Sequence, residues 1–115
     1  MIRPSQVWLV VEAVDMRGGV DGLSQRIQNL LGRSPCDGTA YAFRNRRATR
    51  LKLLIWDGTG VCLFAKRLED GKFRWPAIRD GVIRLTAAQL SALLEGLDWR
   101  RVHEARETPA PTAPS

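Results

Sequence analysis

Cationic side chains near the middle of the chain are the residues whose type and spacing could do chemistry. Guanidinium and ammonium groups hold phosphate oxygens through charge-assisted hydrogen bonds, so several of them fixed on one face would form an anion receptor. The candidate nucleic-acid contacts are Arg17, Arg44, Arg46, Arg47, Arg50, Lys52, Arg67 and Arg74. The pattern predicts a phosphate-binding surface if the neighbouring elements hold these side chains together.

Two short turns in the second half of the chain predict how three of the arginines are arranged. Side chains alternate on either side of two-residue loops at 58–59 and 70–71, which is typical of consecutive β-hairpins. In that register Arg50 lies opposite Arg67, and Arg67 lies opposite Arg74, so an arginine row crosses three strands. Like charges placed opposite each other destabilise a sheet, and a bound anion would relieve the repulsion. The alternative is a solvated face whose long side chains splay apart.

Aromatic residues are interleaved with these cations, as they are in sheet proteins that stack bases on their rings. Trp56 falls on the predicted face that carries Arg50, so it is the candidate for base stacking. Phe64 and Phe73 fall on the opposite face with Leu53, and we expect both to lie in the core.

Signatures of catalysis are sparse. His103, the single histidine, stands beside a proline-rich terminus where it would be poorly held as a base or ligand. Cys36 and Cys62 lack metal-ligand spacing, and Cys62 falls on an apolar strand face, so we expect two reduced thiols. The sequence predicts no catalytic residue, no cofactor and no metal site, and therefore a protein that is not an enzyme.

A metal-dependent nuclease is the remaining enzymatic hypothesis, because carboxylates can gather around a metal ion. The candidate aspartates are Asp21, Asp57, Asp70 and Asp98. Asp57 and Asp70 stand at predicted turns and Asp21 at a predicted helix start, which already explains those three residues.

The charge of the chain narrows the class of partner. Its 115 residues contain 18 Lys and Arg against 12 Asp and Glu, a formal net charge of +6, which favours nucleic acid as the partner. An acidic protein or an anionic membrane surface would also suit this charge. The apolar run at 7–14 is interrupted by Glu12 and is too short to span a bilayer, so we expect a cytoplasmic protein without a membrane partner.

The elements that must position these residues can be read from hydrophobic spacing. Strands are predicted at 7–14, 39–44, 50–56, 61–67, 72–76 and 82–85, and helices at 20–31 and 86–97. Thr86 and Gln89 form a capping-box pattern, and Trp99 is expected to fold back onto the core.

These elements predict one α+β domain at 1–102, followed by a disordered tail at 103–115 that is rich in Pro, Ala and Thr. The expected sheet is mainly antiparallel, has about five strands built from consecutive hairpins, and carries two helices packed on one side. A partly closed barrel is the alternative.

Four segments, in order along the chain, carry a resemblance to a known family: DMRGGVDGL, YAFRNRR, KLLIWDGTGVCLFAKRLEDGKFRWP and LTAAQLSALLEGLDWR. Together they resemble the small accessory protein family called TnpB, encoded by the second open reading frame of bacterial insertion-sequence family 66. The resemblance covers roughly residues 4–101. The family patterns DMR, FRxRR and WDGxGxCLFxKRLExGxFxWP correspond to Asp15, Met16 and Arg17, to Arg44, Arg46 and Arg47, and to Trp56 through Pro76.

The resemblance implies a helper in transposition, encoded beside a separate transposase that cleaves and joins DNA, and it brings no catalytic residues with it. Two mechanisms follow. In the first, the arginines grip phosphates at the ends of the element with little sequence preference. In the second, the sheet or its edge docks onto the transposase or onto a copy of itself, and DNA affinity is incidental. The expected partners are therefore DNA and the transposase, and a homo-oligomer is left open.

Overall fold

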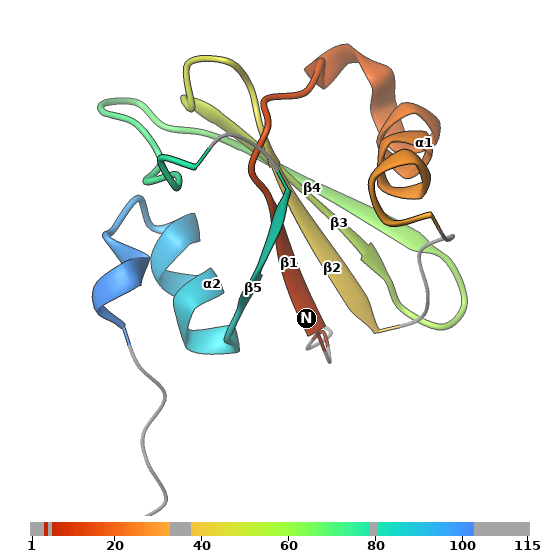
Figure 1. The fold of residues 1–115 in the computed structure, drawn as a ribbon. Coiled ribbons are helices and arrows are strands. Elements are labelled where there is room, and N and C mark those ends of the chain that lie inside the picture. The colour runs from red at the N-terminus through yellow and green to blue at the C-terminus, as the bar shows by residue number, and fades with distance from the viewer. Residues whose placement is uncertain (1–3, 5, 33–37, 79–80, 103–115) are drawn as a thin grey trace, which may run out of the picture.

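The computed structural model describes residues 4, 6–32, 38–78 and 81–102. Five strands form one open sheet in the order β4-β3-β2-β1-β5 (Figure 1). The strands are β1 (Gln6–Val10), β2 (Thr39–Arg44), β3 (Arg50–Trp56), β4 (Val61–Arg67) and β5 (Val82–Leu85). The helices are α1 (Gly19–Leu31) and α2 (Ala87–Leu94), with short 3-10 turns η1 (Met16–Gly18) and η2 (Trp99–Arg101). The α+β class predicted from the sequence is confirmed, whereas Cys36, His103 and the tail at 103–115 lie outside the described residues.

The sheet is mixed, because β1 runs parallel to β2 while every other pair is antiparallel. The connection from β1 to β2 contains η1 and α1, and such a long crossover permits parallel pairing. Consecutive hairpins therefore build only the β2-β3-β4 part. The fifth strand, β5, returns from the far end of the chain to pair with β1, and the sheet does not close into a barrel.

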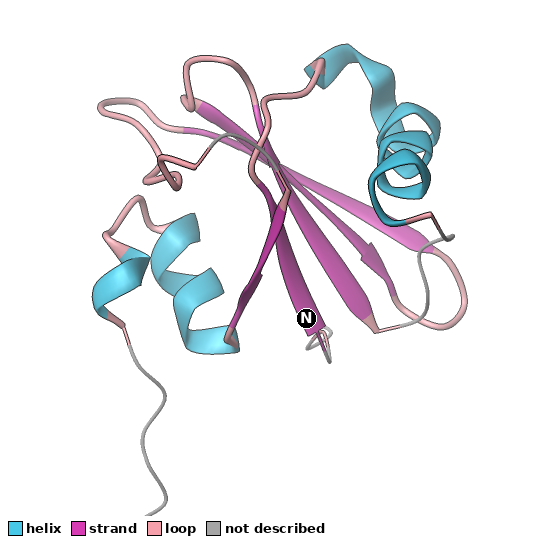
Figure 2. Ribbon diagram, viewed as in Figure 1, coloured by secondary structure: helices cyan, strands magenta, loops and turns pink. Residues whose placement is uncertain are grey.

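The two helices cover opposite faces of this sheet, which corrects the expectation that both pack on one side (Figure 2). The α1 core contains Val10, Leu23, Ile27, Tyr41, Phe43 and Leu54. The α2 core contains Val7, Leu9, Val11, Ala40, Ala42, Leu51, Leu53, Ile55, Phe73, Leu85, Leu90, Ala92, Leu93 and Trp99. Strand β2 is buried on both faces from Thr39 to Phe43, so the sheet needs cover on both sides.

The first predicted hairpin is confirmed in its turn and in its register. The N–H of Asp57 donates to the carbonyl of Gly60 at 3.0 Å, closing a two-residue loop. Arg50 then lies opposite Arg67, and the pairing runs without interruption to Trp56 opposite Val61.

The second predicted hairpin is wrong, because residues 72–76 form no strand. After β4 the chain crosses the β2–β3 loop, where the N–H of Phe73 donates to the carbonyl of Ala48 at 2.7 Å. The Phe73 side chain is buried in the α2 core, and the indole Nε1 of Trp75 donates to the carbonyl of Val10 at 2.9 Å. Burial of Phe73 and the hydrogen bond of the partly buried Trp75 replace pairing along β4, so Arg74 leaves the predicted row.

Because no strand pairs with the outer edge of β4, side chains of β4 that were expected to be buried are exposed. Phe64 was expected in the core and is instead 40% exposed, and Cys62 is exposed as well. The expectation for Phe73 is confirmed, since only 3% of its surface is accessible.

The end of α1 and the start of α2 follow their sequence signals, whereas α1 begins at Gly19 without a side-chain cap from Asp21 and α2 ends at Leu94 rather than at 97. Gly32 caps the C-terminal end of α1, and its φ of 68° is left-handed and therefore suits glycine. Helix α2 begins with the capping box, in which the Thr86 hydroxyl accepts from the Gln89 N–H and the Gln89 side chain accepts from the Thr86 N–H. Trp99 packs in the α2 core, as predicted. None of the helices in the described residues is long and apolar enough to cross a membrane.

Candidate nucleic-acid interface

Four of the predicted cationic residues meet at one place on the α1 side of the sheet. A hollow of about 400 Å³ lies where η1 passes beside β3 and β4, and we call it the basic hollow. It is lined by Arg17, Arg50, Lys52 and Arg67, together with Met16, Leu51, Ala65 and Lys66. Residues distant in the sequence therefore contribute positive charge to one concave surface.

Strand geometry explains why three of these cations share a face. Arg50 and Lys52 are two residues apart on β3, so their side chains point to the same side of the sheet. Arg67 lies directly opposite Arg50 on β4, and Ala65 lies opposite Lys52. The small Ala65 side chain leaves room beside two long ones.

A lysine contact fixes η1 over this face. The Lys52 Nζ donates to the backbone carbonyl of Met16, at the start of η1. An ammonium has three donors, so this bond leaves Lys52 able to contact an anion as well. The same contact brings the neighbouring Arg17 to the rim of the basic hollow.

Arg17 already has an anionic partner. Its Nε and Nη2 donate to the two carboxylate oxygens of Asp15 at 3.1 and 3.0 Å, while 91% of the Arg17 side chain stays exposed. These side-chain bonds, followed by the bond from the Arg17 backbone N–H, lower the pKa of Asp15 from 3.8 to about 2. Asp15 is therefore charged at neutral pH and competes with any phosphate for Arg17.

The β2–β3 loop is held in shape by polar contacts. The Arg44 Nε donates to the carbonyl of Val11 at 3.0 Å, and its Nη1 donates to the carbonyl of Arg46 at 3.2 Å. The Asn45 Oδ1 accepts two backbone N–H groups from the far side of the loop, at 2.9 and 3.0 Å. Arg44 is thus committed to supporting the backbone, while Arg46 and Arg47 are exposed on the loop.

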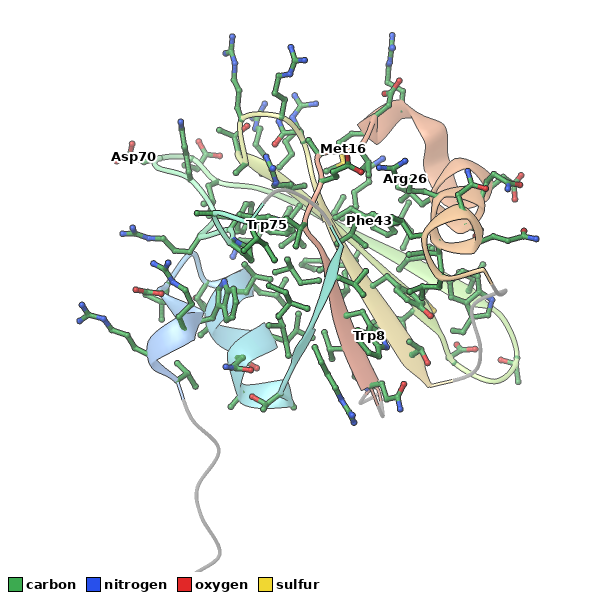
Figure 3. All side chains as sticks on the ribbon, viewed as in Figure 1. Trp8, Met16, Arg26, Phe43, Asp70 and Trp75 are labelled. Carbon is green, nitrogen blue, oxygen red and sulfur yellow. The ribbon has the colours of Figure 1, made fainter. Side chains whose placement is uncertain are left out.

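Loop and hollow lie at the same end of the molecule. Side chains ending in nitrogen project from the β2–β3 loop and from the region of η1, on the side where Met16 is labelled (Figure 3). Among the described residues, no carboxylate lies within ion-pair distance of Arg46, Arg47, Arg50 or Arg67. These four guanidinium groups are therefore available to a ligand at this end of the molecule.

Two predicted site residues lie elsewhere or are partly engaged. Arg74 lines a separate hollow of about 570 Å³ that also includes two carboxylates, Asp70 and Glu95. Trp56 is half-buried, with its ring 6.4 Å from that of Tyr41 and the two planes 84° apart. The structure therefore separates Arg74 from the basic hollow and gives Trp56 a packing role in addition to any stacking.

Two contacts of the cationic residues were not predicted from the sequence: the ion pair of Arg17 with Asp15 and the hydrogen bond from Lys52 to the Met16 carbonyl. Asp15 stands two residues before Arg17, a spacing that allows a local ion pair and was the available signal. The bond from Lys52 to Met16 joins positions 36 residues apart and has no local signal.

Two of the aspartates considered as metal ligands, Asp57 and Asp98, have separate structural roles. The Asp57 Oδ1 accepts the N–H groups of Thr59 and Gly60 at 3.0 and 2.8 Å, which lowers the pKa of Asp57. Asp98 caps η2 and pairs with Arg100 at 3.0 Å. Within the described residues, no three His, Cys, Asp or Glu side chains are grouped so that they could hold a metal ion.

Comparison with known proteins places the chain in a family. The model of the family described as IS66 Orf2 like protein, TnpB_IS66, matches residues 5–104. Two uncharacterised proteins of Sinorhizobium fredii (strain NBRC 101917 / NGR234) are similar. One, y4hO, is 44% identical over 99 residues, which cover 86% of each chain. The other, y4jC, is 38% identical over 105 residues, which cover 89% of this chain and 90% of the relative.

No solved structure matches. The chain therefore belongs to the IS66 Orf2-like family, the transposition-associated accessory proteins of IS66-type insertion sequences.

Proposed function

We propose that this protein is a non-catalytic accessory factor that binds DNA phosphates during transposition of an IS66-type element. The observation that carries the proposal is the facing pair Arg50 and Arg67, which has no carboxylate partner among the described residues and lies beside Lys52. An arginine pair of this kind costs stability in a sheet, and phosphate oxygens would offset that cost.

The mode of binding follows from the groups available. Arg46 and Arg47 on the hydrogen-bonded β2–β3 loop extend the positive surface beyond the basic hollow, so a DNA backbone can be contacted at more than one phosphate. Contacts of this type position a protein on DNA and carry little sequence information. Affinity should therefore be mainly electrostatic and should fall steeply with salt.

The partners that we expect are the DNA at the ends of the element and the transposase encoded with it. In the second mechanism the protein is an adaptor for the transposase and its DNA affinity is incidental. Family membership supports an association with the transposition machinery, and the cationic surface favours the DNA-binding mechanism over the adaptor.

A salt titration with two matched double variants tests the proposal. Fluorescence anisotropy would measure binding to element-end duplex, random duplex and single-stranded DNA at several salt concentrations. Arg50→Ala/Arg67→Ala should weaken binding at least tenfold at low salt and reduce the slope of log K against log salt by about 2. Removing facing like charges should not destabilise the β3–β4 pair, so a loss of binding would not reflect unfolding.

The control is Arg84→Ala/Arg101→Ala, which removes the same charge from exposed positions, one on β5 and one in η2. It should retain nearly wild-type affinity and slope. Equal binding by both double variants would overturn the phosphate-binding proposal and leave the adaptor mechanism. Incubation of DNA with the wild-type protein and Mg²⁺ should give no cleavage, and cleavage that persists through purification would overturn the non-catalytic assignment.

A further inference from the structure

Strand β4 has one open edge. It lies at the end of the sheet and pairs only with β3 among the described residues. The closing bond between Asp57 and Gly60 fixes the alternation, so every second residue of β4 directs its N–H and C=O toward β3. The remaining residues direct these groups outward: Val61, Leu63, Ala65 and Arg67.

This edge lacks the usual protections against pairing. Sheet edges in monomers are commonly interrupted by charge, proline or a bulge. Residues 61–65 are uncharged and contain no proline, and their pairing with β3 is continuous. Val61 and Leu63 are each 37% exposed and Phe64 is 40% exposed. An apolar groove of about 610 Å³ continues from Phe64 across to Leu90 and Leu94 of α2.

We propose that a second copy of this chain pairs antiparallel with β4 along this edge, on a two-fold axis at Phe64. The two sheets then join into one continuous sheet. Val61 lies opposite Arg67 of the second copy, and Leu63 lies opposite its Ala65. This register uses every outward-facing backbone group of both strands, giving about eight inter-copy hydrogen bonds by the antiparallel alternation. The two Phe64 side chains become a directly opposed aromatic pair.

The charge distribution along β4 selects a second copy as the occupant. Lys66 and Arg67 stand at one end of the strand, and Asp57 stands at the turn beside the other end. Antiparallel pairing about Phe64 sets Lys66 of each copy opposite Cys62 of the other, and the Cys62 Sγ donates to the Asp57 carboxylate at 3.5 Å. The Lys66 Nζ donates to the carbonyl of Leu94 at 2.6 Å and keeps further donors for that carboxylate. Arg67 stays on the other face of the sheet, in the basic hollow. The strand is therefore complementary in charge and in apolar pattern to its own reverse.

The axis runs perpendicular to the sheet, so the two basic hollows face the same side of the dimer. Arg67 of one copy and Arg67 of the other are separated by the six residues from Val61 to Arg67, about 20 Å at ~3.3 Å per residue. The dimer therefore presents two anion-receptive surfaces in one plane. The pairing itself depends only on β4 and does not rest on the proposed DNA binding.

Sedimentation velocity across protein concentrations from about 1 to 100 μM tests the pairing. The wild type should reach twice the 12.9 kDa of one chain. Ala65→Pro removes an outward N–H while leaving the pairing with β3 possible, and Phe64→Lys places like charges on the axis. Both variants should remain monomeric, with dimerisation weakened at least tenfold.

The matched control is Ile78→Lys, the same kind of change at an apolar side chain that is 56% exposed and lies outside β4. It should dimerise as the wild type does. A wild type that is monomeric at every concentration, or an Ala65→Pro variant that dimerises normally with an unchanged circular dichroism spectrum, would overturn the proposal. DNA binding measured on the monomeric variant separates this outcome from a failure of the phosphate-binding proposal.

Disulfide trapping tests the register independently. In a Cys36→Ser background, Lys66→Cys would face the native Cys62 of the second copy at a closely spaced pair, about 4.5 Å between Cα atoms. Mild oxidation should give a covalent dimer. Ala65→Cys places its thiol on the other face of the sheet from Cys62 and should give little cross-linking. Equal cross-linking of the two variants would rule out this register.

Discussion

At the scale of single residues, the basic hollow contains its own competitor. Asp15 holds Arg17 through two charge-assisted hydrogen bonds and also accepts the Arg17 backbone N–H at the start of η1. The pKa of Asp15 is lowered to about 2, mainly by the Arg17 side chain. A phosphate approaching Arg17 must therefore displace or share a carboxylate.

Asp15→Asn should raise DNA affinity several-fold and make the salt slope slightly steeper, because Arg17 would gain freedom to contact phosphate. Asparagine caps helices about as well as aspartate, so η1 should remain in place. Anisotropy titrations of the variant and the wild type measure the change, with Asp98→Asn as the control at another arginine-paired cap. Unchanged affinity would show that Arg17 does not contact DNA.

The pH dependence of this effect follows from the sign of the shift. The pKa of Asp15 is lower in the folded protein than its ordinary 3.8, so the stabilisation from its pairing is complete above pH 3.8. That stabilisation is lost as the pH falls through about 2. Asp15 therefore stays fully charged between pH 5 and 8. The ratio of DNA affinities between Asp15→Asn and the wild type, measured by anisotropy, should be constant over that range.

The sequence predicted which arginines form the candidate site, but it predicted only part of their spatial arrangement. The register that joins Arg50 to Arg67 followed from the Gly58–Thr59 turn, because turn type and alternation fix pairing locally. The approach of Arg17 depends on the bond from Lys52 to Met16, which is a tertiary contact.

At the scale of elements, the sequence predicted those features whose hydrogen bonds join residues close together in the chain. The capping box of α2 and the glycine end of α1 are examples. The expected strand at 72–76 failed because Phe73 found a buried position and Trp75 found the carbonyl of Val10. A pattern of alternating residues cannot reveal that a deeper burial site exists elsewhere in the fold.

Thr86→Ala should lower the free energy of unfolding by about 1 kcal/mol, because α2 would lose the hydroxyl that accepts the Gln89 N–H. Urea denaturation followed by circular dichroism measures this change. Thr86→Ser retains the hydroxyl and should cost less than half as much. If the alanine and serine variants were equally stable, the capping bond would contribute nothing to stability.

At the scale of the whole molecule, one sheet separates two cores. Ile27 belongs to the α1 core and Leu93 to the α2 core, and both side chains are fully buried. The sequence did not predict that helices cover both faces of the sheet. The apolar residues on both faces of β2 indicated a strand, but a strand buried on both faces also requires an element packed on each side. Since β1, β2 and β3 contribute to both cores, neither core can melt without disturbing the other.

Ile27→Ala and Leu93→Ala should each lower the free energy of unfolding by about 2–5 kcal/mol, since each leaves a cavity in a packed interior. In both variants, far-UV circular dichroism and tryptophan fluorescence should report a single coincident transition. Ile78→Ala, at an exposed site, should change stability by less than about 0.5 kcal/mol. Two separate transitions in either core variant would show that the cores are independent.

The position of β1 between β2 and β5 has a consequence for synthesis of the protein. Strand β1 acquires its last neighbour only when Val82–Leu85 has been translated, after α1, β2, β3 and β4. Until then one side of β1 remains bare, and such an unfinished strand is prone to pair with other nascent chains. A chain truncated before Val82 should therefore be insoluble, because β5 is the strand that completes the pairing of β1.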